Sequence, residues 1–193
     1  MATARRMGPR GSEIWHSMLD AAEVILRDFG YGALTSRRIA EQIGVKQRLV
    51  YYYFQTMDEL IVETFRRLAS RDLERMKLGL ASNHSLREIW DVCIHTTDTR
   101  MVQEFMALAN RSEPLRAQVQ EYIEASREMH VSALSGAMRD AGLDKLMSPE
   151  AAAIFGAAAA LAVHREAQVG VTRGHADVIA VIDSFIARLD PIE

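Results

Sequence analysis

The chain has 193 residues, of which 49% are hydrophobic and 25% are charged, and its formal net charge is −3. This composition excludes a wholly disordered or fibrous chain. The longest uncharged apolar run, 151–163, is mostly alanine and is shorter than the ~20 apolar residues that a membrane-spanning helix needs. The single cysteine, Cys93, excludes an internal disulfide and a cysteine-based zinc site. The amino-terminal segment lacks the apolar core of a signal peptide, so we expect a cytoplasmic protein with no membrane partner.

The charge is unevenly distributed along the chain. Residues 1–55 carry eight Lys or Arg against five Asp or Glu, a balance of +3, so the remainder carries −6. A basic end on an acidic body is typical of a protein that meets a polyanion at that end. We expect residues 1–11 to form a flexible basic tail. Its arginines (Arg5, Arg6 and Arg10) either reach DNA or remain solvated.

Apolar residues recur every three or four positions along most of the chain, and no alternating strand pattern interrupts them. This periodicity predicts an all-α fold of about nine helices. Capping boxes at Thr56 and Ser85 mark two of the helix starts. The expected helices cover residues 12–29, 36–43, 46–54, 57–81, 85–97, 101–108, 114–142, 149–169 and 176–189.

The first three expected helices form a helix-turn-helix pattern, in which two short helices joined by a glycine-containing turn are braced by a longer one. The third helix, 46–54, begins with Lys46, Gln47 and Arg48 and has no capping side chain, which favours an anion such as DNA phosphate there. Gln47 suits adenine and Arg48 suits guanine in the major groove. The alternative is that its three tyrosines pack in a core and its two cations are merely solvated.

Residues 35–60 read TSRRIAEQIGVKQRLVYYYFQTMDEL, preceded by AAEVILRDFGY at 21–31. This stretch resembles the DNA-binding signature of TetR-family transcriptional regulators, and the resemblance covers about residues 12–65. The rest of the chain matches that family only in the number and length of its helices. The resemblance implies an all-helical dimer, usually a repressor until a small molecule binds its carboxy-terminal part.

The resemblance also implies roles at individual positions. Thr35 and Ser36 would meet phosphate, the third helix and Tyr52 would approach the bases, and two further tyrosines would bond the DNA backbone. The chain departs from the family at positions 46 and 48, which are usually small, and at Met57, where a phosphate-binding lysine is usual. The expected DNA-binding residues are Thr35, Ser36, Lys46, Gln47, Arg48, Tyr51, Tyr52 and Tyr53.

We expect a DNA-binding domain at 12–56 and an effector-binding and dimerisation domain at 57–193. Helix 149–169 is small on every side, and helix 176–189 is apolar over more than one face. Two such helices predict half of a two-fold four-helix interface, with burial inside one subunit as the alternative. The expected interface residues are Ala153, Ala157, Ala160, His164, Val178, Ile182, Phe185 and Leu189.

Methionines and aromatic residues with scattered polar groups in the body suit a pocket that binds an apolar ligand, although core packing explains most of them equally well. Asp91 and His95, four residues apart, suit either a shared metal or a surface ion pair, and the sequence supplies no third ligand. The expected pocket residues are Trp90, Cys93, Phe105, Met106, Tyr122, Met129, His130 and Phe155.

The sequence therefore predicts a ligand-responsive transcriptional regulator, foremost a repressor that binds a palindromic operator as a dimer and is released by a small apolar or amphipathic effector. Its expected partners are double-stranded DNA, that effector and a second copy of the chain, without cofactor or metal. DNA binding would associate it with the nucleoid. We expect no enzyme, because nucleophile-elbow, phosphate-loop and zinc-protease motifs do not occur. A helical enzyme or an interaction protein with an incidental helix-turn-helix remains the alternative.

Overall fold

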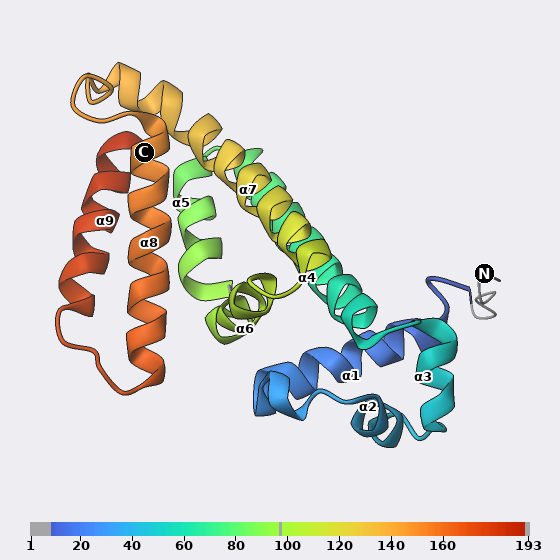
Figure 1. The fold of residues 1–193 in the computed structure, drawn as a ribbon. Helices are drawn as coiled ribbons and strands as arrows, with labels where there is room; N and C mark the ends of the chain where they lie inside the picture. The colour runs from blue at the N-terminus through green and yellow to red at the C-terminus, as the bar shows by residue number, and fades with distance from the viewer. Residues whose placement is uncertain (1–8, 97, 192–193) are drawn as a thin grey trace. The chain divides into compact units, whose positions relative to one another are not determined.

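The structure, a computed structural model, describes residues 9–96 and 98–191. All regular structure in these residues is helical, which confirms the predicted all-α fold (Figure 1). The expected tail arginines at positions 5 and 6 lie outside the described residues. The described residues form nine α-helices: α1 Glu13–Phe29, α2 Ser36–Gln42, α3 Gln47–Tyr53, α4 Met57–Leu80, α5 Ser85–Asp91, α6 Thr99–Ala109, α7 Glu113–Asp140, α8 Pro149–Gln168 and α9 His175–Leu189.

The chain divides into two compact units. The first comprises the described residues up to 68 together with 100–119, and the second comprises 69–99 and 120–191, apart from residue 97. The first unit therefore extends beyond the expected DNA-binding segment, because it includes the start of α4, most of α6 and the first turns of α7.

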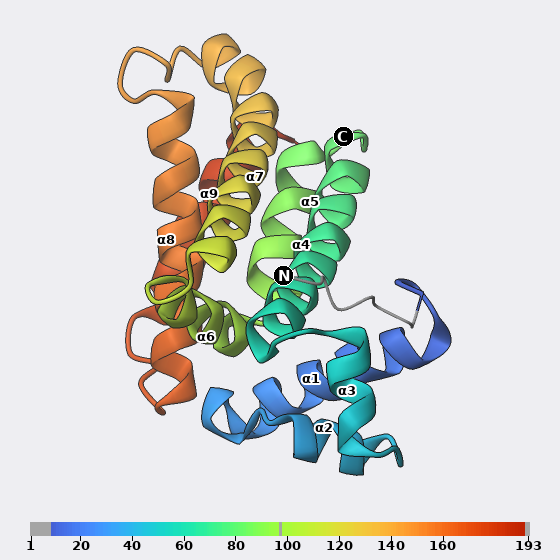
Figure 2. The same ribbon diagram turned by 45° about the vertical axis from the view of Figure 1, so that its right-hand side comes forward.

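The first unit is built around α1, which begins where Ser12 Oγ accepts the Trp15 N–H at 3.3 Å. Figure 2 shows α2 and α3 gathered against α1. The rings of Trp15 and Phe54 stack with their centroids 6.0 Å apart, which ties α1 to the residue after α3. The tight turn between α2 and α3 depends on Gly44, whose φ of +71° is open to glycine and strained for other residues.

An arginine of α4 joins this helix to α1. Arg67 Nε donates to the Glu23 carboxylate at 2.8 Å, and its terminal nitrogens contact Asp20 at 2.7 Å and the His16 carbonyl oxygen at 3.3 Å. A second contact of Arg67 with Glu23 is closer still. Because Arg67 and Glu23 are both largely buried, the pair fixes the position of α4 on α1 inside the first unit.

The two expected capping boxes have different outcomes. At the start of α4, Thr56 Oγ1 accepts the Glu59 N–H at 3.1 Å, which confirms the hydroxyl half of the box, while the Glu59 carboxylate accepts the N–H of Gln55, one residue before the cap, at 2.8 Å. At the start of α5 the expected cap from Ser85 is wrong. There the carboxylate of Asp190, at the end of α9, accepts two backbone N–H groups of the first turn at 3.1 and 3.3 Å.

In the second unit α8 and α9 run antiparallel and side by side, in contact with each other (Figure 1). The expected helix at 85–97 is α-helical only to Asp91 and continues as a π-helical turn, Val92–Thr96. Such turns widen the backbone and occur frequently at functional sites. No helix of the described residues is both long and apolar enough to span a bilayer.

Candidate nucleic-acid interface and interior polar cluster

The third helix presents its polar end to solvent. Lys46, Gln47 and Arg48 are exposed, whereas Val50 and Phe54 are buried and anchor the helix in the unit. No side chain caps the amino-terminal end of α3. Two exposed cations and an uncapped helix end make this part of the surface electropositive, the property that binds a phosphate backbone.

A chain of polar side chains links α2 to α3. Gln47 Nε2 donates to Ser36 Oγ at 2.9 Å, and Ser36 Oγ donates to the Tyr51 hydroxyl oxygen at 3.1 Å. The structure buries Ser36 and Tyr53, two residues that the resemblance assigns to DNA contact. Thr35 is exposed, and its Oγ1 caps α2 by accepting the Arg38 N–H at 3.1 Å. Thr35, the two cations, Gln47 and the half-exposed Tyr51 thus form the exposed part of the expected set, and Tyr52 is half-buried.

Inside the second unit, α4, α7 and the π-helical turn bring polar side chains together. The Tyr122 hydroxyl donates to Asp72 Oδ2 at 2.5 Å, and Arg75 contacts the other oxygen of Asp72 at 3.0 Å. Cys93 Sγ lies 3.2 Å from His130 Nε2, while His130 Nδ1 lies 2.7 Å from the carbonyl oxygen of Ser126. We call Asp72, Cys93, Tyr122, Ser126 and His130 the interior polar cluster.

Burial governs the ionisation of this cluster. It raises the pKa of the Cys93 thiol to about 12, with a further contribution from the negative charge of Asp72. It also raises the pKa of the Tyr122 hydroxyl, together with the charge of Asp72 and the hydrogen bond to it. The pKa of His130 is lowered by burial, against the opposing effect of its hydrogen bond to Ser126. At neutral pH the thiol, the phenol and the imidazole are therefore all uncharged.

The expected pocket residues are only partly brought together. Cys93, Tyr122 and His130 share the interior polar cluster. Phe105 belongs to the first unit, where its ring meets Phe65 edge-on with 5.1 Å between centroids, and Met106 of the same helix is exposed. The remaining three lie elsewhere in the second unit: Trp90, which donates to Asp183 of α9 at 3.1 Å, half-buried Met129 and exposed Phe155.

Sequence reasoning missed Asp72, although a signal for it exists. Asp72 lies on the apolar stripe of α4, four residues before the buried Met76 and seven after the buried Phe65, yet it is a carboxylate. A carboxylate at a buried position of a helix needs polar partners, so this pattern predicts polar side chains packed against Asp72.

The expected interface residues also divide into two groups. Ala153 and Ala160 are buried within the second unit, and the other six are at least partly accessible. The larger apolar side chains that α8 and α9 expose include Phe155, 65% exposed, and Val181, 67% exposed. The full set of exposed large apolar residues on these helices is Ile154, Phe155, Leu161, Val178 and Val181.

The Asp91–His95 pair is an exposed ion pair with 2.8 Å between carboxylate oxygen and Nδ1. No group of three potential metal ligands occurs among the residues that the structure describes. The ion-pair alternative is therefore the one that the geometry supports for these two residues.

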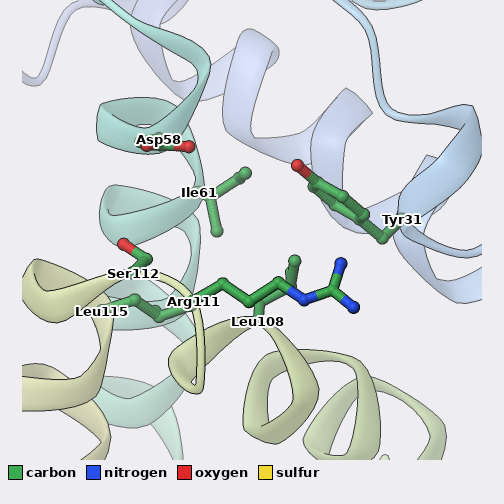
Figure 3. Close-up of a pocket in the computed structure, with 7 residues that line it drawn as sticks. All are labelled: Tyr31, Asp58, Ile61, Leu108, Arg111, Ser112 and Leu115. Carbon is green, nitrogen blue, oxygen red and sulfur yellow. The ribbon is translucent and has the colours of Figure 1, made fainter.

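A small cavity of about 90 Å³ lies in the first unit, between Tyr31, the start of α4 and the turn from α6 to α7 (Figure 3). Its polar lining includes Asp58, Arg111 and Ser112, whose Oγ is buried without a protein partner. Beside it, the Tyr31 N–H donates to the Glu104 carboxylate of α6 at 3.3 Å. The volume suits a few water molecules and is well below the ~300 Å³ of a small-molecule pocket, so this cavity is not the expected effector site.

The amino-terminal helices and their exposed polar end define a class, the helix-turn-helix DNA-binding proteins. A model of the family described as bacterial regulatory proteins, tetR family, matches residues 18–64. The match covers α2, α3 and the adjoining parts of α1 and α4, so this segment is similar to the DNA-binding part of TetR-family transcriptional regulators.

The chain is also similar to a curated protein and to solved structures. The fatty acid metabolism regulator protein of Bacillus subtilis is 25% identical over 71 residues, a match that spans only 37% of this chain and 37% of that protein. A TetR transcription regulator from Haloarcula marismortui has a TM-score of 0.71 at 18% identity, with 90% of this chain and 96% of that chain covered. A fatty acid degradation regulator from Bacillus halodurans has a TM-score of 0.65 at 14% identity, with 94% and 97% covered. At such identities the two solved structures show the fold alone.

Proposed function

We propose that the protein is a dimeric repressor that binds a palindromic operator through α3 and is released when a small apolar or amphipathic effector enters the second unit. The observation that carries the proposal is the exposed polar end of α3, where two cations and Gln47 surround an uncapped helix start. We call α3 with its exposed polar end the reader. One reader contacts a single half-site of the operator through one short helix, so a two-fold dimer binds more tightly and recognises a palindrome.

DNA binding is tested by fluorescence anisotropy on the DNA that flanks the coding region, at several salt concentrations. Arg48→Ala should weaken binding to the specific site by about 5- to 150-fold, because an arginine that pairs with a guanine contributes about 1–3 kcal/mol. Lys77→Ala, which removes an exposed cation of α4 in the second unit, is the matched control and should leave affinity unchanged. Equal affinity of wild type and Arg48→Ala at physiological salt would count against α3 as the reader.

Dimerisation is supported by the apolar face that α8 and α9 leave exposed. Apolar side chains such as Phe155 and Val181 are exposed to water in one subunit. A partner subunit that covered them would stabilise the dimer by about 25 cal/mol per Å² of apolar surface buried. Val181→Asp should give monomers in sedimentation velocity at micromolar concentration and should abolish cooperative operator binding. Leu146→Asp changes an equally exposed apolar residue between α7 and α8 and should remain dimeric. A monomeric wild-type protein would exclude this interface.

The interior polar cluster is the proposed place for the polar group of the effector, since it combines an uncharged thiol, phenol and imidazole with apolar neighbours such as Met76. Relatives named for fatty acid regulation make acyl compounds a first set to screen by thermal shift, alongside other amphipathic ligands. A ligand at 100 times its Kd stabilises the folded protein by about 2.7 kcal/mol. Tyr122→Phe should reduce the shift, whereas Met106→Ala, a change at an exposed residue of the first unit, should not.

Release from DNA is the last step of the proposal. Helix α4 carries Arg67, which holds α1 in the first unit, and Asp72, which belongs to the interior polar cluster. An effector that binds one arrangement of Asp72 more tightly than another can therefore change operator affinity through α4. The size of that change is limited by the difference between the effector's affinities for the two arrangements. An effector that stabilises the protein yet leaves operator affinity unchanged would contradict this coupling.

A further inference from the structure

The polar chain between α2 and α3 has a direction. Ser36 has one hydroxyl hydrogen, which it donates to Tyr51, so toward Gln47 it acts as an acceptor. Ser36 is 4% exposed and Tyr51 is 50% exposed. The buried Ser36 thus lies in the middle of this series of hydrogen bonds. The two residues at its ends, Gln47 and Tyr51, lie at the surface, where they could contact DNA.

The two end residues of this hydrogen-bonded series, Tyr51 and Gln47, each keep defined donors or acceptors for DNA. Tyr51 accepts from Ser36, so its own hydroxyl hydrogen is available to an outside acceptor such as a phosphate oxygen. Gln47 gives one amide hydrogen to Ser36 and keeps its carbonyl oxygen and its second amide hydrogen. Hydrogen bonds in such a chain polarise one another, so occupation of one end strengthens the other.

We propose that Ser36 is a positioning residue that sets base preference without touching DNA, by fixing which way the Gln47 amide faces. A free glutamine amide can rotate by half a turn and exchange its donor and acceptor. With its nitrogen held by Ser36, Gln47 presents an acceptor and a donor side by side, the pair that matches N6–H and N7 of adenine. The inference rests on the proposed role of α3 as the reader.

This role differs from the phosphate contact that the resemblance implies for position 36. A hydroxyl on a residue that is 4% exposed, with its hydrogen given to Tyr51 and its oxygen accepting from Gln47, is already engaged on both sides. Its removal acts first on Gln47, the base reader, and only through Gln47 on DNA.

The test measures the affinity of the full-length protein for an operator series in which each base pair is changed singly. Ser36→Ala should reduce discrimination at the adenine that Gln47 reads by about tenfold, while affinity for non-specific DNA stays the same. Ser36→Cys, which is similar in size but a weak acceptor, should have the same effect and guards against a folding defect of the first variant. Lys46→Ala is the matched control, since loss of an exposed cation should weaken binding to all sequences about equally and keep the discrimination.

The decisive comparison uses the Gln47→Ala background, in which Ser36→Ala should change discrimination no further. A uniform loss of affinity in Ser36→Ala, with discrimination intact, would overturn the inference and assign Ser36 a structural or phosphate role. A loss of discrimination that persists without Gln47 would overturn it as well. Failure of the wild type to bind any flanking DNA would instead refute the proposed function, and with it the premise of this inference.

Discussion

The pair between Arg67 and Glu23 makes the sharpest prediction about stability. In Arg67→Ala, Glu23 keeps its charge in a site where its side chain is only 8% exposed, and it loses two short contacts with the guanidinium. Removal of one partner from a buried ion pair costs about 3–5 kcal/mol. The contact of Arg67 with Asp20 adds little, because the Asp20 side chain is 67% exposed and such pairs contribute about 0–1 kcal/mol.

Chemical denaturation followed by circular dichroism measures these losses. Arg67→Ala should lower the free energy of unfolding by about 3–5 kcal/mol, which for a chain of this size corresponds to a fall in Tm of about 10 °C or more. Asp20→Ala is the matched control and should lose no more than about 1 kcal/mol. The double variant Arg67→Met with Glu23→Gln should recover part of the loss, since the buried side chain at position 23 is then uncharged. Equal losses in Arg67→Ala and Asp20→Ala would refute the reasoning.

Three further predictions concern the second unit. Asp190→Ala removes the carboxylate that caps α5 and should cost about 1–2 kcal/mol, with faster amide hydrogen exchange at Leu86 as the local sign. His130 has a lowered pKa, so the unfolded chain takes up a proton first and stability should fall as the pH drops below about 6.5, a dependence that His130→Gln should flatten in urea titrations. Cys93 has a pKa raised to about 12, so stability should fall as the pH rises from 9 towards 12, and Cys93→Ala should remove that component. Native Cys93 should also react slowly with thiol reagents at neutral pH, because its raised pKa leaves very little thiolate, and fast labelling would contradict that raised pKa.

Local signals predicted the helices well and long-range contacts poorly. Apolar periodicity located eight of the nine helices of the described residues to within two residues at each end, and Thr56 Oγ1 caps one predicted start, because both signals depend on neighbours in sequence. The cap of α5 comes from Asp190, more than a hundred residues away along the chain, and no local pattern encodes such a pairing. The π-helical turn after Asp91 likewise replaces an α-helix without a proline or glycine to signal it.

The candidate site shows the same division. The exposure of Arg48 follows from its helical register opposite Val50, and that of Lys46 from its place just before the first turn of α3, so sequence sufficed for both. The burial of Ser36 depends on how α2 packs against α3, which its own residue type does not reveal. On α8, Ala153, a predicted interface residue, is buried inside the unit, whereas Phe155, a predicted pocket residue, is exposed, because long-range packing decides which residues of a helix its own unit covers.

The chain has two tryptophans, and the fold places one in each compact unit. Trp15 stacks on Phe54 in the first unit, and Trp90 is hydrogen-bonded to Asp183 in the second. Intrinsic fluorescence is therefore a built-in optical reporter for each unit, without an attached dye. Trp15→Phe and Trp90→Phe would give single-tryptophan proteins whose emission follows the reader and the body separately, so that operator and effector titrations could be observed by two independent signals.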